Sequence, residues 1–198
     1  MMILYSAPRS PYARKVRMAL LELDLGERVE IRSVNPFDNQ PDHLATNPLA
    51  RVPALQLPDG TRLCDSRLIL DYLDETFAAA TDPGHRDWAQ RNRIVLAEGV
   101  MDAACGLVSE ERRPREVRHE AAAWRLEDVL SRALLALEAS SQALSAELAG
   151  RLEITLCCTL GYMDFRLSAI AWRAICPTLA DWFGSFSQRP SAQRTAPR

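Results

Sequence analysis

The sequence of 198 residues predicts two parts of different class, a small mixed α/β domain and then an all-helical domain. Short apolar segments alternate with helical patterns over the first eighty residues, whereas further along apolar residues recur only at spacings of three and four. Between these two regions lies Asp82-Pro83-Gly84, which is typical of a linker. We therefore expect domains at 1–78 and 87–198, with the linker at 79–86.

The α/β part is expected to have the order βαβ and then ββα. The expected elements are a strand at 2–6, a helix at 11–23, a strand that begins at 29–31, a loop at 35–50, a hairpin of strands at 52–57 and 61–63, and a helix that starts at 65–66. A strand, helix and strand of this length imply a parallel pair joined by a right-handed crossover. The sequence thus predicts a mixed sheet of four strands with helices packed on it.

The second part shows only helical periodicity. Apolar residues from 94 to 108 and from 126 to 137 form the inward stripes of two long helices. Residues 154–163 are apolar nearly all round, which is typical of a helix buried within a bundle. Aromatic residues between 172 and 186 supply a last packing layer. We therefore predict a helical bundle for this part.

The overall composition excludes several classes of protein. A net charge of −2 gives no field that attracts nucleic acid, and the longest apolar run is too short to cross a membrane. The first residues are not expected to form a signal peptide. Five cysteines without a Cys-x-x-Cys spacing indicate free thiols, and the scattered histidines indicate no metal site. We expect a cytoplasmic protein without nucleic-acid or membrane partners.

The start of the first helix contains the strongest candidate group, Ser10. Serine is a good N-cap, and Pro11 suits the first helical position because its missing N–H would have no partner there. Free N–H groups and the helix dipole at such a start lower the pKa of a bound thiol, and the serine hydroxyl can donate one more hydrogen bond to the thiolate. The alternative is that Ser10 is a cap and nothing more.

The same segment has the shape of a Cys-Pro-Tyr-Cys redox loop, with Ser10 and Ala13 in place of the cysteines. Thiol–disulfide exchange needs an attacking thiolate. Exchange chemistry at this loop is therefore excluded.

Two further features are candidates for peptide recognition. If the bond between Val52 and Pro53 is cis, Val52 presents its main-chain N–H and C=O as a free edge, to which a peptide-like ligand adds as a short strand. An ordinary trans turn is the alternative, since only about 5–6% of X-Pro bonds are cis. Asp65 and Ser66 suit the ammonium and carboxylate of an amino-acid end, although both are also common residues at the start of a helix.

Taken together, these features resemble the N-terminal domain of glutathione transferases. The resemblance rests on residues 3–6, 9–17, 47–55 and 64–66, and bacterial members of the serine-using kind, related to the zeta and beta classes, are the most similar. Residues 161–166 and 189–191 look like the corresponding C-terminal helical domain, so the resemblance covers nearly the whole chain. It implies a thioredoxin-like domain followed by an all-helical domain, a homodimer and a role in detoxification.

The resemblance also implies roles for single residues. Ser10 falls where the family contacts the glutathione thiol. Val52 falls at the main chain that pairs with the cysteinyl unit, and Pro53 falls at the family's cis-proline. Asp65 and Ser66 fall at the pair that holds the γ-glutamyl end, although the family often has Glu where this chain has Asp65.

Asn35 and Arg51 sit where family members often have Lys or Gln near the tripeptide. Tyr12 and Arg9 are candidates for the side of the electrophile, with a packing aromatic as the alternative for Tyr12. The basic residues 112–115 are most simply a solvated turn.

The resulting functional hypothesis is a glutathione S-transferase. Glutathione is the co-substrate, no metal takes part, and the activated thiol attacks a small hydrophobic electrophile. The alternatives are a noncatalytic binding protein with the same fold, and a glutathione-dependent isomerase or peroxidase.

Overall fold

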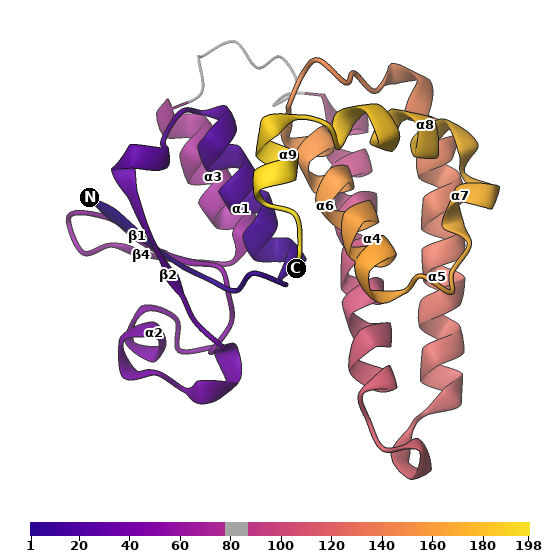
Figure 1. Cartoon of the computed structure of the whole chain (residues 1–198), viewed down its shortest axis with the longest axis horizontal. Coiled ribbons are helices and arrows are strands. Elements are labelled where there is room, and N and C mark those ends of the chain that lie inside the picture. Colours follow the sequence, from indigo (N-terminus) through magenta and orange to yellow (C-terminus); the bar gives the residue numbers. More distant parts are fainter. Residues whose placement is uncertain (78–86) are drawn as a thin grey trace. The chain divides into compact units, whose positions relative to one another are not determined.

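The computed structural model describes residues 1–77 and 87–198 (Figure 1). The chain forms two compact units, of which the first is Met1–Pro83 with Pro190–Arg198 and the second is Gly84–Arg189. The linker expected at 79–86 lies outside the described residues. The domain limits 1–78 and 87–198 stay a prediction, and the structure adds that the last residues group with the first unit.

The first unit contains a sheet of four strands with the order β2-β1-β3-β4. Its elements are β1 (Met2–Ser6), α1 (Pro11–Glu22), β2 (Val29–Ser33), α2 (Pro41–Thr46), β3 (Ala54–Gln56), β4 (Arg62–Cys64), α3 (Ser66–Phe77) and α9 (Pro190–Arg194). β1 is parallel to β2 and antiparallel to β3, and β3 is antiparallel to β4. The mixed four-stranded sheet with helices that the sequence predicts is confirmed.

The two faces of this sheet are packed differently. Leu4 and Leu55 are register partners on one face and are fully buried. Tyr5 and Ala54 share the opposite face because side chains alternate along a strand. On that face the ring of His43, from α2, lies 5.7 Å from the ring of Tyr5, between centroids. Helices α1 and α3 run side by side (Figure 1).

Two local predictions differ from the structure. The stretch 35–50, expected to be a loop, contains α2, which begins with Pro41 at a position where proline's fixed φ favours a helix. The third strand is also shorter than expected and begins at Ala54. The residue before it, Pro53, has no N–H to give to a strand ladder.

The C-terminal segment packs against α1 within the first unit. Arg14 of α1 is only 5% exposed, and its Nη2 donates to the carbonyl oxygen of Ala192 at 3.1 Å. Its Nε donates to Oγ1 of Thr195 at 3.4 Å. The hydroxyl of Ser191 donates to the carboxylate of Glu22 at the other end of α1. The last residues of the chain therefore hold the first helix along its length.

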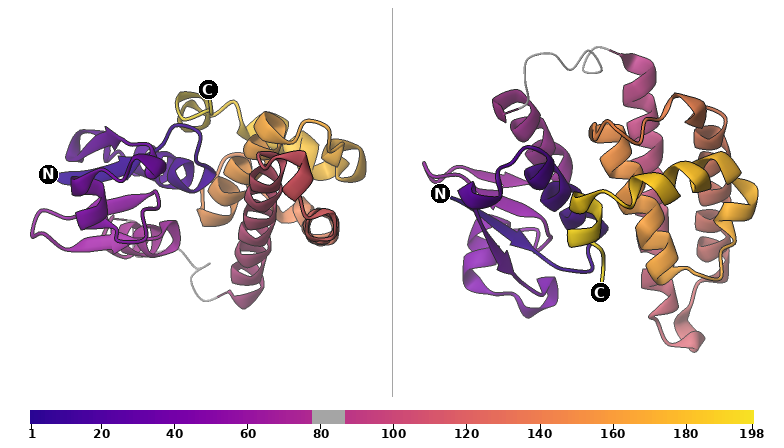
Figure 2. Two further views of the ribbon diagram at one scale, coloured as in Figure 1. Left: turned by 90° about the horizontal axis from the view of Figure 1, so that it is seen from below. Right: turned by 45° about the horizontal axis from the view of Figure 1, so that its top comes forward.

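From residue 87 onward, the regular structure of the second unit is helical. Its helices are α4 (Trp88–Glu111), α5 (Glu120–Glu138), α6 (Arg151–Arg166), α7 (Trp172–Ile175) and α8 (Pro177–Phe186). The long helices α4 and α5 form a hairpin, and α6 packs against α4 (Figure 2). Residues 152–160 of α6 are all buried, as the apolar run predicts. The hydroxyl of Thr159 donates to the carbonyl oxygen of Ala97 at 3.2 Å and joins α6 to α4.

Glu138, the last residue of α5, caps the start of α8. Its Oε1 accepts from the N–H of Thr178, and its Oε2 accepts from the N–H of Leu179, each at 2.8 Å. Burial acts to raise the pKa of Glu138, but these hydrogen bonds outweigh it and hold the pKa below its usual value. None of the helices in the described part of the chain has the length and apolar character needed to cross a bilayer.

Candidate functional site

The candidate residues of the first unit gather at one edge of its sheet. Tyr5, Ala54 and Cys64 form a single row across β1, β3 and β4. β3 runs opposite to β1 and to β4, so the end of β1, the start of β3 and the end of β4 lie at the same edge. The segments that carry Ser10, Val52-Pro53 and Asp65-Ser66 all leave or enter the sheet there.

The width of this edge matches a short peptide. Neighbouring strands lie about 4.8 Å apart, so β1 and β4 are separated by about 10 Å. An extended chain of three residues also spans about 10 Å. A tripeptide that lies across the strand ends therefore reaches from the segment after β1 to the segment after β4.

Ser10 caps α1 at one end of this row. Its Oγ accepts from the N–H of Ala13 at 3.2 Å, and its main chain is extended. The hydroxyl proton is donated to no group among the described residues. The first turn of α1 contains no acidic residue, so the positive end of the helix dipole is not neutralised there. A half-buried hydroxyl is thus available beside the start of a helix, and its capping bond leaves its proton unused.

The centre of the row is the main chain at Val52. The bond between Val52 and Pro53 is cis, the geometry that the family resemblance implies for Pro53. Val52 is half-buried and packs against Tyr5, Val34 and Ala54. Within the described ranges, neither its N–H nor its C=O has a hydrogen-bond partner. This segment can pair with a peptide in the way that an unpaired strand does.

Sequence reasoning missed the two side chains that shape this central segment. Nδ2 of Asn47 donates to the carbonyl oxygen of Arg51 at 2.8 Å, and Nε2 of His43 donates to the same oxygen at 3.0 Å. Oδ1 of Asn47 also accepts from the N–H of Leu49 at 3.0 Å, a turn that asparagine commonly forms. Both side chains are buried. The Asn-Pro pair at 47–48 was the signal for the turn, and nothing local signals the role of His43.

Asp65 and Ser66 form the other end of the row at the start of α3. Asp65 is exposed with a φ of 80°, and its Oδ1 accepts from the N–H of Arg67 at 2.8 Å. It is therefore the helix cap, and its second carboxylate oxygen faces no donor among the described residues. Ser66 is 2% exposed, and the described part of the chain offers no partner to its hydroxyl or its N–H. An acceptor and two donors are thus adjacent and unused.

The remaining candidate residues lie outside the row of Ser10, Val52 and Asp65-Ser66. Nδ2 of Asn35 donates to Asp38 at 2.7 Å, and its Oδ1 accepts from the N–H of Phe37 at 3.3 Å, so this amide is engaged in its own turn. Asn35 nevertheless follows β2, whose end lies at the same edge because β2 is parallel to β1. The guanidinium of Arg51 is exposed and has no partner within the described ranges. Tyr12 is half-buried on α1, and the guanidinium of the exposed Arg9 donates to the main-chain oxygen of Arg198 at 3.0 Å.

Two cysteine thiols of the protein have raised pKa values. Cys64 is half-buried, and burial together with the neighbouring Asp65 raises the pKa of its thiol. Burial also raises the pKa of Cys176 to about 11. Across the described residues, no group of three or more His, Cys, Asp or Glu side chains is arranged to hold a metal ion.

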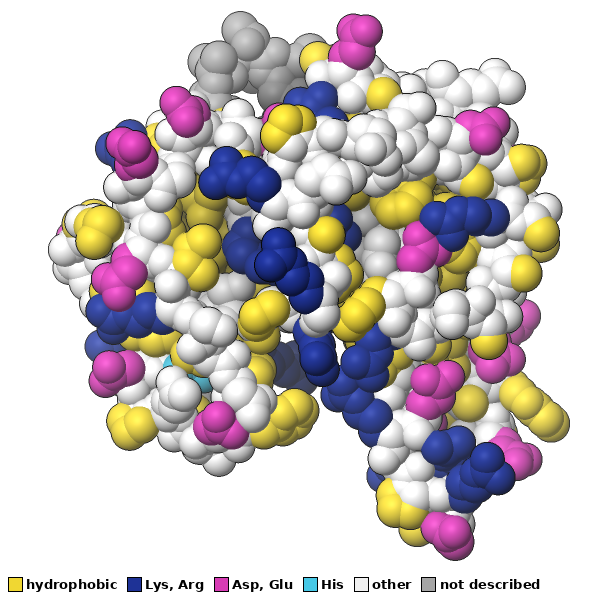
Figure 3. All heavy atoms as spheres, in the orientation of Figure 1, with side chains coloured by type: hydrophobic (Ala, Val, Ile, Leu, Met, Phe, Trp, Pro, Cys, Tyr) yellow, Lys and Arg dark blue, Asp and Glu magenta, His cyan; other side chains and the backbone are white. Residues whose placement is uncertain are grey.

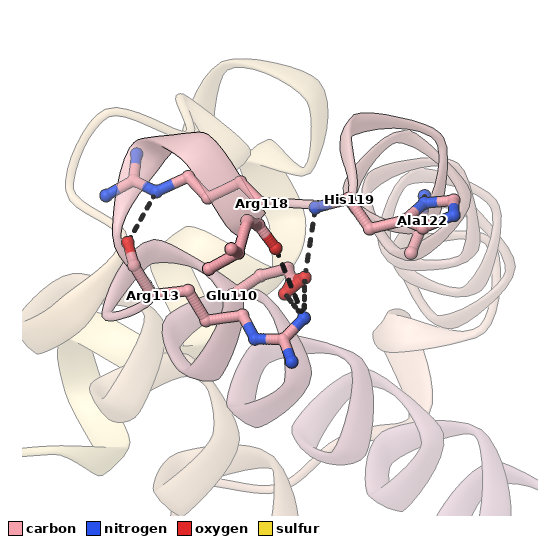
Figure 4. Close-up of polar contacts among 6 residues, drawn as sticks. Glu110, Arg113, Arg118, His119 and Ala122 are labelled. Atoms are coloured by element: carbon pink, nitrogen blue, oxygen red, sulfur yellow. Dashed lines mark hydrogen bonds and ion pairs between the residues drawn. The ribbon is translucent and has the colours of Figure 1, made fainter.

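The basic turn between α4 and α5 is held by its own hydrogen bonds (Figure 4). The guanidinium of Arg113 donates to the carboxylate of Glu110 at 3.2 Å, which also accepts from the N–H of His119. Nε of Arg118 donates to the carbonyl oxygen of Arg113 at 3.0 Å, and the N–H of Ala122 donates to Nδ1 of His119. Basic and acidic side chains are mixed at this end of the hairpin (Figure 3). The arrangement agrees with a solvated turn.

Comparisons with known proteins point to one family. A family model described as the N-terminal domain of glutathione S-transferase matches residues 4–81. The uncharacterised GST-like protein YibF of Escherichia coli is 30% identical over 195 residues, which cover 95% of each chain. The maleylacetoacetate isomerase of Pseudomonas aeruginosa is 38% identical over 79 residues, about 38% of this chain and 37% of that protein.

Solved structures agree with this assignment. A glutathione transferase family member from Pseudomonas fluorescens Pf-5, crystallised with bound glutathione, is 36% identical with a TM-score of 0.92, and the match covers 100% of both chains. The same protein with S-(propanoic acid)-glutathione gives a TM-score of 0.88 over the same share of both chains. These matches cover both the sheet and the helical unit of the chain. The chain therefore belongs to the glutathione S-transferase family.

Proposed function

We propose that this protein is a glutathione transferase that binds glutathione along the sheet edge of its first unit and activates the thiol at Ser10. One observation carries the proposal, namely that three sets of unused polar groups lie in a row at the ends of β1, β3 and β4. The row is long enough to hold a short peptide. The glutathione bound to the similar protein from Pseudomonas fluorescens Pf-5 supports this choice of ligand.

Each part of glutathione has a partner of matching chemistry in this row. The free oxygen of the Asp65 carboxylate accepts from the ammonium of the γ-glutamyl group, and Ser66 donates its hydroxyl and N–H to the adjacent carboxylate. The main chain of Val52 exchanges hydrogen bonds with the cysteinyl unit. Arg51 and Asn35 lie beside the proposed tripeptide, and no specific hydrogen bond is assigned to either side chain.

Activation takes place at the thiol. The uncompensated N-terminus of α1 favours the thiolate over the thiol, and the Ser10 hydroxyl donates a hydrogen bond to the sulfur. The thiolate then forms a carbon–sulfur bond with the electrophile. In a displacement the leaving group departs with its electron pair. In an addition to a double bond, the electron pair moves to the adjacent carbon, which takes a proton from water.

The isomerase alternative rests on the similarity to maleylacetoacetate isomerase, which covers only about 38% of this chain. An isomerase of this kind and a transferase share the activated thiol and differ in the acceptor. The S-(propanoic acid)-glutathione bound to the similar protein is a stable thioether, the type of product that transfer generates. This observation favours transfer. The homodimer stays a prediction from the family resemblance, and the cytoplasmic location stays a prediction from the composition of the sequence.

The binding site is tested by calorimetric titration with two ligands, glutathione and the dipeptide Cys-Gly. Asp65→Asn should weaken glutathione binding by about tenfold, because a hydrogen bond to a charged group contributes about 1.5–3 kcal/mol and Asp65 is exposed. Cys-Gly lacks the γ-glutamyl group, so its weaker binding should be unchanged. Asparagine is preferred to alanine here because it tolerates the positive φ of Asp65 and still caps α3.

Asp59→Asn is the matched control. Asp59 is also an exposed carboxylate that accepts from a main-chain N–H, that of Thr61 at 2.9 Å, but it lies in the turn at the opposite end of β3 and β4. Its substitution should leave both ligands unaffected. Equal affinity of wild type and Asp65→Asn for glutathione, or an equal effect of the two substitutions, would contradict the assigned site.

A further inference from the structure

One main-chain oxygen of the candidate site accepts two hydrogen bonds from buried side chains. The carbonyl oxygen of Arg51 accepts from Nδ2 of Asn47 at 2.8 Å and from Nε2 of His43 at 3.0 Å. His43 lies within α2, Asn47 directly follows this helix, and both residues are at most 1% exposed. A carbonyl oxygen has two lone pairs, so both are occupied. The oxygen is therefore held toward α2.

This oxygen belongs to the same peptide group as the N–H of Val52. The bond between Arg51 and Val52 is trans, and a trans peptide group is planar with its C=O and N–H directed oppositely. Because the oxygen is held toward α2, the N–H of Val52 is directed away from that helix. There it finds no acceptor among the described main-chain groups. The two side chains thus set the direction of the central hydrogen-bond donor of the row.

The contacts of His43 fit this single task. Its Nε2 carries a proton, because the carbonyl oxygen of Arg51 can only accept. Its Nδ1 is buried and has no hydrogen-bond partner in the described part of the chain. The ring also lies beside that of Tyr5, a contact that a phenylalanine would make as well. Packing alone therefore does not call for a histidine, whereas the bond to Arg51 does.

Asn47 forms the turn that brings the oxygen of Arg51 back to its own amide. Its Oδ1 accepts from the N–H of Leu49, and its main-chain oxygen accepts from the N–H of Ala50, each at 3.0 Å. Ala50 has a φ of 53°, a left-handed conformation that reverses the chain and that alanine rarely adopts. Hydrogen bonds to a carbonyl oxygen also polarise its peptide group, which makes the N–H of Val52 a stronger donor.

We propose that His43 and Asn47 are positioning residues for glutathione, which direct the N–H of Val52 to the cysteinyl carbonyl oxygen of the ligand. This assignment rests on the proposed function, which places the cysteinyl unit at Val52. Both side chains act through the peptide group between Arg51 and Val52. They therefore contribute to the affinity for glutathione and not to the activation of its thiol.

Two substitutions each remove one of the donors. His43→Phe keeps a ring beside Tyr5, and Asn47→Asp keeps the acceptor for the N–H of Leu49. In calorimetric titration, His43→Phe should weaken glutathione binding by about three- to tenfold, as expected for one hydrogen bond. Asn47→Asp should weaken it more, because a carboxylate repels the carbonyl oxygen. His43→Gln supplies an amide N–H near the position of Nε2 and should restore most of the affinity.

Thr46→Val is the matched control for these variants. Thr46 is also buried on α2, and its Oγ1 donates to the carbonyl oxygen of Asp42 at 3.0 Å. Its substitution removes one hydrogen bond of the same helix without changing the donors to Arg51, so glutathione affinity should stay within about twofold. In all variants, the ultraviolet absorbance of the thiolate should give the pKa of the bound thiol found for the wild type.

A second ligand tests the partner of the Val52 N–H. In the thioamide analogue of glutathione, sulfur replaces the cysteinyl carbonyl oxygen and is a weak acceptor. The loss of affinity caused by His43→Phe should therefore be smaller for this analogue than for glutathione. Equal losses for the two ligands, no loss in either donor variant, the same loss in Thr46→Val, or a raised thiol pKa would each overturn the positioning role.

A measurement without ligand separates this proposal from the proposed function. The coupling between the amide and α protons of Val52, read by nuclear magnetic resonance, depends on its φ. It should change in His43→Phe and Asn47→Asp and stay constant in Thr46→Val, and an unchanged coupling in both donor variants would overturn the role. If the wild type binds no glutathione while the couplings change as expected, the proposed ligand is wrong and the control of the Val52 N–H is supported.

Discussion

Ser10 is the cap of α1 and the proposed donor to the glutathione thiolate, and a set of three substitutions separates these two roles. The structure shows the hydroxyl as the cap of α1, accepting from the N–H of Ala13 at 3.2 Å. The proposed function adds a second bond, in which the same hydroxyl donates to the glutathione thiolate. Ser10→Thr keeps both bonds. Ser10→Ala removes both, and Ser10→Gly removes the hydroxyl but leaves a residue that is itself a fair helix cap.

The expected stabilities follow from the cap alone. Replacing a serine cap by alanine costs about 1 kcal/mol, whereas replacing it by glycine costs only a few tenths. For a chain of this size, 1 kcal/mol lowers the melting temperature by about 2–4 °C. Thermal unfolding should therefore rank the glycine variant close to the wild type and the alanine variant clearly below it.

The expected activities follow from the thiolate. A hydrogen bond to a charged group contributes about 1.5–3 kcal/mol, which corresponds to a loss of about 10- to 150-fold in turnover. Loss of this hydrogen bond should also raise the pKa of the bound thiol by about one to two units, because one unit equals 1.36 kcal/mol. The thiol pKa is read from the ultraviolet absorbance of the thiolate across a pH titration. Glycine and alanine should lose activity equally, and threonine should retain it.

The hypothesis is refuted if the variants rank in the same order by activity as by thermal stability. If Ser10→Gly keeps both its activity and the thiol pKa of the wild type, while Ser10→Ala loses activity in step with its stability, the hydroxyl is a helix cap and nothing more. The thiol would then be activated by the main-chain N–H groups at the start of α1.

Two further substitutions test the packing within each unit, Glu138→Gln in the second and Thr195→Val in the first. Glu138→Gln should destabilise the protein by about 1–2 kcal/mol at pH 7, because one N–H at the start of α8 loses its partner. The pKa of Glu138 is lowered by folding, so its contribution is complete above the unfolded value of about 4.3 and is lost as the pH falls through the folded value. Urea unfolding at pH 7 and below pH 4 should show the difference shrinking. Thr195→Val should cost about 1–3 kcal/mol in thermal unfolding by removing the partner of the buried Arg14. Thr195→Ser should cost less, and equal costs would assign the effect to packing.

Much of the fold was predictable because its signals are local. The apolar strand that ends at Ser6 and the stripe of apolar residues on α1 repeat with periods that identify their structure. The short helix α2 was missed because six residues show no helical period and Pro41 and Asp42 are also common in loops. The place of Thr195 was missed for another reason, since only a folded chain brings it to Arg14, far away in the sequence.

The candidate site also has features that local sequence predicts and features that only the fold determines. The residue types at Ser10, Pro53 and Asp65 each suggested a chemical role from their neighbours in sequence. Their gathering at one edge depends on the direction and register of β3, which are long-range properties. The support from His43 depends on how the loop closes over the carbonyl oxygen of Arg51. Local sequence thus identifies the candidate groups, and the topology of the sheet brings them to one edge.

The return of Pro190–Arg198 to the first unit makes that unit discontinuous in the chain. During synthesis, the partners of Arg14 leave the ribosome after the helical unit, so α1 reaches its final packing only once that unit has been made. A single cut between the units also cannot release the complete first unit. An isolated first unit would need Pro190–Arg198 rejoined to the rest of it, for example through a circular permutation that places this segment ahead of Met1.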